Sequence, residues 1–257
     1  MKDKELTFWG HLEAFRQMLF RMIIALVALM VIVFLCKSFV FDTLILAPRS
    51  SEFILYRWLC ALGNQFPWAD MCPEPFHIDL ININLSSQFI IHLSSSFWIA
   101  LILGFPYLVW ELWRFIAPAL YPKEQRSVKY AFFFSSLLFY AGVAVAYFLI
   151  FPFALQFLGS YQVSAEVKNQ ISLQSYISTL TSLVLAMGIV FEFPVLVHIL
   201  SRIGIVNRAM LRKYRRHAIV ALLILAAIIT PADIFSMILA AIPLYLLYEI
   251  SILTCKS

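Results

Sequence analysis

The sequence predicts an all-α membrane protein that forms one membrane-embedded domain over residues 1–257 and crosses the bilayer with six transmembrane helices. Three observations predict this architecture. The chain is 63% hydrophobic and 13% charged, with a mean hydropathy of +0.89, whereas about a quarter of the residues of soluble domains are charged. Six apolar segments are separated by polar ones, and basic residues gather in alternate loops. The net charge of +5 therefore reflects membrane topology rather than nucleic-acid binding.

The apolar runs set the expected spans. A short cytoplasmic amphipathic helix is expected within residues 1–18, because Phe8, Leu12 and Phe15 share one stripe at helical spacing. The fifth span has 14 residues, which rise by about 21 Å, whereas a bilayer core is about 30 Å thick. We therefore expect the last two spans to form a short hairpin. The six spans are 19–36, 87–110, 129–151, 175–200, 217–230 and 236–253.

The distribution of basic residues predicts the orientation. Fifteen of the 19 Lys and Arg residues lie near the N-terminus, in the loops around 111–129 and 202–216, or at the C-terminus. The other four are Lys37, Arg49, Arg57 and Lys168. Because cytoplasmic loops carry the excess of Lys and Arg, we expect both termini in the cytoplasm.

The polar stretch 113–126 lies between the second and third spans. Pro118 interrupts a helix there, and the aromatic side chains of Phe115 and Tyr121 are of the kind that settle at a membrane interface. Glu124 is the only acid between Arg114 and Lys129. The stretch is therefore a candidate site for a cationic ligand, because a carboxylate matches the geometry of a guanidinium.

Glu192 lies inside the fourth span, where an ionised carboxylate costs about 3 kcal/mol on insertion scales. Pro194 leaves the carbonyl of Val190 without its helical donor, so a kink is expected beside it. An ionisable residue within a membrane is by default a functional hypothesis. The alternative is a protonated glutamic acid that a neighbouring helix satisfies.

Two cysteines, Cys60 and Cys72, lie in the loop after the first span, on the side expected to be oxidising. A disulfide between them is permitted, as are two free thiols. The spacing suggests no metal site. No nucleophile, zinc or phosphate-binding motif is present, so we expect neither an enzyme nor a bound cofactor.

Several motifs together resemble the TatC family, the receptor subunit of the twin-arginine protein translocase. The stretch F-I-A-P-A-L-Y-P-K-E-x-R resembles its first cytoplasmic loop, and His11 to Arg16 resembles the H-L-x-E-L-R motif near its N-terminus. The family glutamate of that motif falls on Ala14, and the carboxylate here is one residue earlier, at Glu13. Matches also occur at F-E-x-P and T-P-x-D, and at three prolines in positions typical of the family: Pro48, Pro194 and Pro231.

The resemblance implies a receptor in the bacterial cytoplasmic (inner) membrane that binds twin-arginine signal peptides and exports folded proteins using the proton gradient. It implies single-span partner subunits of the TatA/TatB type, contact with lipid, and self-association. The recognition site would comprise Glu124, Phe115, Leu12, Glu13, Arg16, Pro118 and Tyr121. Contacts to the partner subunits would involve Glu192, Thr230 and Asp233.

Two other classes compete with this interpretation. A small proton-coupled secondary transporter would use Glu192, Glu249 and His198 as a relay, but it would be expected to show an internal repeat, and the sequence shows none. An intramembrane protease would need a base beside the serines at 94–96, and the sequence supplies no such context.

Overall fold

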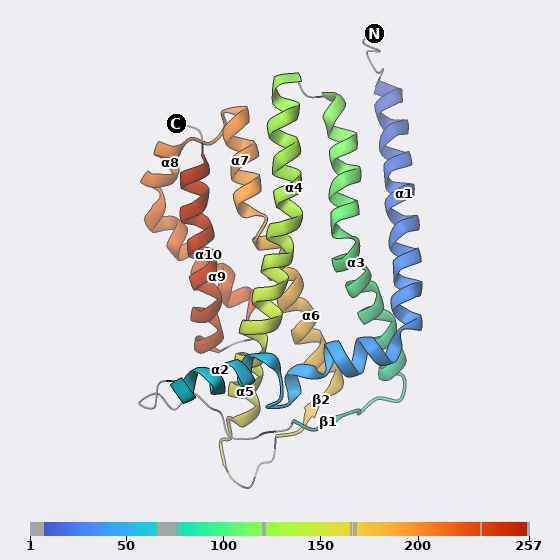
Figure 1. Cartoon of the computed structure of the whole chain (residues 1–257), viewed down its shortest axis with the longest axis vertical. Helices are drawn as coiled ribbons and strands as arrows, with labels where there is room; N and C mark the ends of the chain where they lie inside the picture. Colours follow the sequence, from blue (N-terminus) through green and yellow to red (C-terminus); the bar gives the residue numbers. More distant parts are fainter. Residues whose placement is uncertain are drawn as a thin grey trace.

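The computed structural model describes residues 8–65, 76, 78–119, 122–164, 166, 169–231 and 233–255. These residues form a bundle of long helices with a layer of short elements across one end (Figure 1). The first helix begins and the last helix ends at the opposite, upper end of the view. A chain that crosses the bundle an even number of times begins and ends on the same side, so this arrangement agrees with six spans. The expected all-α fold is confirmed.

Helix α1 runs without a break from Phe8 to Leu35. The expected amphipathic segment and the first span are therefore parts of one helix, because no helix-breaking residue lies between them. Helix α1 packs against α3 (Ser87–Ile116), which continues six residues beyond the expected end of the second span at 110. The 3₁₀ turn η3 (Ala117–Ala119) follows, and α4 begins at Pro122. The polar stretch is therefore mostly helical, since proline is tolerated in the first turn of a helix.

The third span also continues beyond its expected end at 151. Helix α4 (Pro122–Val145) passes through a π-helical segment, η4 (Ala146–Ile150), into α5 (Phe151–Ser160). Pro152 stands in the first turn of α5, the part of a helix that tolerates a proline best. The π segment directly before it absorbs the change in hydrogen-bond register.

The fourth span is divided, as Pro194 predicts. Helix α6 (Leu173–Val190) ends two residues before α7 (Phe193–Ile203), and Pro194 lies in the first turn of α7. Helix α7 ends at Gly204, whose φ of 87° is in the left-handed region that glycine adopts without strain. The short α8 (Arg208–Lys213) follows it.

The final hairpin consists of α9 (Arg215–Ile229) and α10 (Ile234–Thr254), which pack side by side. In the part of the chain that the structure describes, five helical segments are long and apolar enough to cross a membrane: 9–35, 87–116, 132–160, 173–203 and 234–254. Helix α9 is not among them. Its 15 residues span about 22 Å, which fits the expectation of a short fifth crossing. The sixth crossing is longer than expected, because the 21 residues of α10 are enough to span a bilayer.

Short elements close the lower end of the bundle in Figure 1. They include η1 (Phe39–Ile45), η2 (Ala47–Arg49) and α2 (Ile54–Gln65). Strand β1 (Leu80–Ile81) pairs in parallel with β2 (Ile171–Ser172), with Leu80 opposite Ile171. The buried Pro48 opens η2, and the hydroxyl of buried Tyr56 donates to the Pro152 carbonyl at 2.7 Å.

The core lies where α4, η4, α6 and α10 meet, around Leu183, Met187 and Leu244. Two glycines let α4 and α6 approach closely. A Cβ at Gly142 would lie 2.6 Å from the Met187 carbonyl oxygen, and one at Gly188 would lie 2.7 Å from the Phe139 ring. Small residues at helix contacts are typical of membrane bundles. In lipid, helices associate through close van der Waals packing, because burying apolar side chains gives no hydrophobic gain there.

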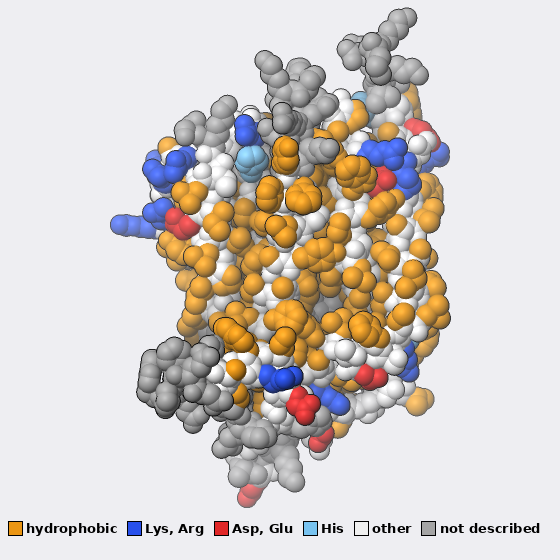
Figure 2. Space-filling view, viewed as in Figure 1, with side chains coloured by type: hydrophobic (Ala, Val, Ile, Leu, Met, Phe, Trp, Pro, Cys, Tyr) orange, Lys and Arg blue, Asp and Glu red, His pale blue; other side chains and the backbone are white. Residues whose placement is uncertain are grey.

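The outer surface is that of a lipid-facing protein. Figure 2 shows a broad band of hydrophobic side chains around the middle of the molecule, with charged side chains gathered at its two ends. Helix α1 contributes an exposed apolar stripe that includes Phe20, Ile24 and Val27. The described chain therefore divides into an apolar belt and two polar caps, as a bilayer requires.

Candidate functional site

Two aromatic side chains join α1 and α3 at the upper end of the bundle. The rings of Phe15 and Phe115 lie with their centroids 5.7 Å apart. This contact brings the Leu12 to Arg16 turn of α1 beside the last turns of α3, as the recognition hypothesis requires. Leu12 itself is 50% exposed and lies free at the surface of α1.

Glu13 faces away from this junction. Its Oε1 accepts hydrogen bonds from Arg16 Nη2 at 2.7 Å and from Gln17 Nε2 at 3.1 Å, both in the same helix and both exposed. Ala14 and the buried Met18 lie one turn apart on the stripe that α1 turns toward α3. A neighbouring residue on a helix is rotated by about 100°, so Glu13 does not occupy the direction of the family glutamate.

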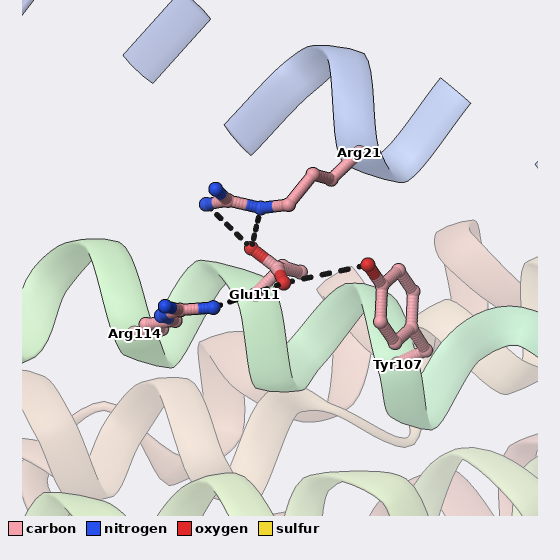
Figure 3. Close-up of polar contacts among 4 residues, drawn as sticks. All are labelled: Arg21, Tyr107, Glu111 and Arg114. Atoms are coloured by element: carbon pink, nitrogen blue, oxygen red, sulfur yellow. Dashed lines mark hydrogen bonds and ion pairs between the residues drawn. The ribbon is translucent and has the colours of Figure 1, made fainter. Parts of the chain in front are cut away.

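The best-formed polar cluster near the junction surrounds Glu111, which the sequence reasoning missed. Its side chain is 4% exposed, and its Oε2 accepts from Arg21 Nε and Arg21 Nη2, each at 2.9 Å. Figure 3 shows Arg21 reaching from α1 to the carboxylate on α3, with Tyr107 and Arg114 on its other side. The Tyr107 hydroxyl lies 3.4 Å from Oε1 and Arg114 Nη1 lies 3.9 Å from it, so among the described residues this second oxygen has only long contacts.

The predicted second span ended at residue 110, so Glu111 was assigned to a loop and its pairing with Arg21 was not predicted. A signal was nevertheless present. Arg21 is a lone cation within the first apolar run, and Glu111 directly follows the second. Opposite charges at similar depths in two spans are expected to pair. Glu111 is therefore a further carboxylate, besides Glu192, in a helical segment long enough to cross the membrane.

The remaining residues of the expected recognition site follow α3. Pro118 lies exposed in η3. Tyr121 lies outside the described residues. Glu124 falls in the first turn of α4, where the helix dipole favours an acid. The backbone thus brings the Glu124 position close in sequence and space to the end of α3, while the contacts of its side chain lie outside the described structure.

A second polar site lies at the break between α6 and α7. The Ser135 hydroxyl of α4 donates to Glu192 Oε2 at 2.6 Å. The other oxygen, Oε1, is buried and has no hydrogen-bond partner among the described residues. Glu192 therefore has room for one further donor, although the structure does not join it to the α1–α3 junction.

The hairpin tip between α9 and α10 uses its polar groups internally. The Thr230 hydroxyl donates to the Ala226 carbonyl at 2.9 Å. Asp233 caps α10, because its Oδ1 accepts from the Ser236 N–H at 2.6 Å and its Oδ2 accepts from the Ser236 hydroxyl. Thr230 is 6% exposed and Asp233 is 9% exposed. Pro231 lies between them, half-buried.

The cysteines divide as the compartment argument suggests. Cys60 in α2 is disulfide-bonded, whereas Cys36 and Cys255 are free thiols. Cys72, the other cysteine of the loop after the first span, lies outside the described residues.

Known proteins resemble this chain over nearly its whole length. The family model described as Sec-independent protein translocase protein (TatC) matches residues 10–243. A TatC protein of Blattabacterium sp. subsp. Periplaneta americana (strain BPLAN) is 36% identical over 253 residues, which are 98% of this chain and 95% of the relative. The TatC protein of Escherichia coli (strain K12) is 39% identical over 173 residues, 67% of each chain. The crystal structure of the twin-arginine translocase receptor TatC in DDM matches with a TM-score of 0.71 at 31% identity, over 96% of this chain and 100% of that one.

Proposed function

Because the chain belongs to the TatC family of Sec-independent protein translocases, we propose that it is the subunit that binds twin-arginine signal peptides. Membership makes the chain a component of a protein translocase in the bacterial inner membrane and not an enzyme. The finer proposal is that it receives folded cargo proteins by their signal peptides and exports them using the proton gradient.

The observation that carries the proposal is the contact between Phe15 and Phe115. It gathers the N-terminal turns of α1 and the end of α3 into one surface at the upper end of the bundle. The exposed Leu12 side chain and the two rings offer apolar contact to a peptide. The same surface leads directly into the first turn of α4, which carries Glu124.

We assign the arginine-binding carboxylate to Glu124. The two other acids of this region already pair with arginines of the chain itself, Glu13 with Arg16 and Glu111 with Arg21. The Glu111 carboxylate is buried and held by Arg21, so it is not open to a ligand guanidinium. The Glu13 carboxylate is exposed, but it is held within α1 by Arg16 and Gln17. Guanidinium binds carboxylate through two parallel hydrogen bonds, so a twin-arginine ligand is preferred to a twin-lysine one.

We further propose that Glu192 meets a polar side chain of a single-span partner subunit of the TatA/TatB type. Its unpartnered Oε1 supports this, because a buried acceptor without a donor is destabilising by about 1–3 kcal/mol. The internal hydrogen bonds of Thr230 and Asp233 favour a structural role for the hairpin tip. Self-association of the chain stays part of the proposal.

Photo-crosslinking tests the recognition surface. A photoreactive amino acid at Leu12 or Phe115 should capture a twin-arginine peptide, and a twin-lysine peptide should compete poorly. Trp58, which is exposed at the other end of the bundle on α2, is the matched control and should capture neither. Capture at Trp58 alone, or equal competition by the two peptides, would remove the recognition site from the α1–α3 junction.

A further inference from the structure

A groove of about 560 Å³ runs along the bundle surface between α4, α7 and α10. It lies apart from the α1–α3 junction and from the hairpin tip. The exposed side chains of Tyr130 and Phe134 form one of its walls, so the groove opens sideways toward the lipid. None of the roles assigned above uses it.

The direction of the three helices gives this groove one polar end and one apolar end. Helix α4 descends from the upper end of Figure 1, whereas α7 and α10 rise toward it. The residues nearest the upper end are therefore Tyr130, Arg202 and Thr254, and all three carry polar groups. The deeper lining residues are Leu138, Pro194 and Ile250, all apolar. The eight residues from Pro194 to Arg202 rise by about 12 Å.

Two nitrogen-bearing side chains face the polar end. Arg202 and His198 are one helical turn apart on α7, and both line the groove. Among the described residues neither has an ion-pair or hydrogen-bond partner. By contrast, Arg215 at the start of α9 is paired with Glu249 at 2.9 Å. Figure 2 shows a histidine and a cationic side chain at the upper end of the belt, directly above hydrophobic side chains.

We propose that this groove binds one anionic phospholipid. Its phosphate would accept hydrogen bonds from Arg202 and from an N–H of His198, and an acyl chain would lie along Leu138 and Ile250. The order of polar and apolar groups matches that of a phospholipid entering from the bilayer, and basic pockets between transmembrane helices are known to take such headgroups. A cationic signal peptide is disfavoured here because no described acid lines the groove.

Native mass spectrometry of the full chain in detergent tests the proposal. The protein is offered equal amounts of phosphatidylglycerol and phosphatidylcholine with the same acyl chains, and the ratio of the bound lipids is measured. Arg202→Gln should lower the preference for phosphatidylglycerol by about fivefold, the effect of one cation near an anionic lipid surface. Arg202→Lys should keep most of it, since a phosphate accepts a point charge as well. Arg212→Gln, an exposed cation on α8, is the matched control.

Each other outcome would overturn the proposal. Equal losses in Arg202→Gln and Arg212→Gln would mean that lipid responds only to the overall charge. Val195→Phe, which fills the groove without altering its charge, should also displace the lipid; unchanged retention would place the lipid elsewhere. Displacement by inorganic phosphate at equal concentration would show a site for free phosphate instead. Thermal unfolding of each variant separates lost binding from lost folding, and peptide crosslinking at Phe115 reports separately on the proposed receptor function.

Discussion

Replacing Arg21 with glutamine should destabilise the protein more than replacing its partner Glu111 with glutamine. The two side chains form one ion pair, but Arg21 is 41% exposed and Glu111 is 4% exposed. Arg21→Gln would leave a buried carboxylate whose remaining contacts with described residues are long, to the Tyr107 hydroxyl at 3.4 Å and to Arg114 at 3.9 Å. Glu111→Gln would leave a cation that can turn toward water.

The magnitude follows from that asymmetry. Removing one partner of a fully buried ion pair costs about 3–5 kcal/mol. Because Arg21 is partly solvated and Arg114 can move closer, we expect about 2 kcal/mol for Arg21→Gln. Glu111→Gln should cost about 1 kcal/mol or less, since the amide still accepts a hydrogen bond. The double variant should therefore be less destabilised than the sum of the two single variants.

A double-mutant cycle measured by unfolding in detergent checks this prediction. The exposed pair of Glu13 and Arg16 is the matched control within the same helix, and it should show almost no coupling. Equal costs for the two single variants at the buried pair would refute the reasoning. A coupling energy between Arg21 and Glu111 no larger than that of the control pair would also refute it. The ion pair would then contribute nothing to the packing of α1 on α3.

Three further predictions concern the remaining site residues. Glu124→Ala should weaken twin-arginine peptide binding by tenfold or more and reduce the preference for arginine over lysine, because a charged hydrogen bond is lost. Glu13→Ala should change neither the affinity nor the preference. Titration of labelled peptide into each purified variant measures both quantities. Glu192→Gln should fold and bind peptide but impair export. Glu192→Leu should melt at a higher temperature than the unaltered protein, because it removes a buried acceptor that has no donor among the described residues. Full export activity in Glu192→Leu would mean that this residue has only a structural role. Non-reducing peptide mapping should find Cys60 joined to Cys72, a link that stabilises the protein by roughly 3 kcal/mol in the chain-entropy model, and detection of Cys72 as a free thiol would exclude the pairing.

The number and order of the apolar helical segments could be predicted from the sequence because their causes are local. Long apolar runs must become helices in lipid, where each backbone N–H needs an internal acceptor. The break before Pro194 was predicted from the missing N–H group of proline. Packing must contribute to it, because Pro106 and Pro243 lie inside the unbroken helices α3 and α10. The shortness of α9 follows from the distance between the basic loop and Pro231. The helix ends were predicted less well: α3 continues to Ile116 and the chain passes Pro152 without leaving the membrane-spanning segment 132–160.

Family motifs also indicated the proposed recognition region, because they are contiguous stretches of sequence. They did not determine how each side chain is directed. The pairing of Glu13 with Arg16 and Gln17 depends on the rotation of α1 against α3, and one residue changes that direction by about 100°.

Only the tertiary structure decided which polar groups meet across the bundle. Arg21 and Glu111 are 90 residues apart in the chain, and Ser135 and Glu192 are 57 apart. Their contacts depend on which helices are neighbours, on how far each helix is shifted along its axis, and on which face it turns toward its neighbour. The hydropathy of a segment determines none of these. The same holds for the groove between α4, α7 and α10, whose lining combines Tyr130, Arg202 and Thr254 from three helices that are far apart in the sequence. A sequence determines the depth of a residue in the membrane, whereas packing determines what that residue faces.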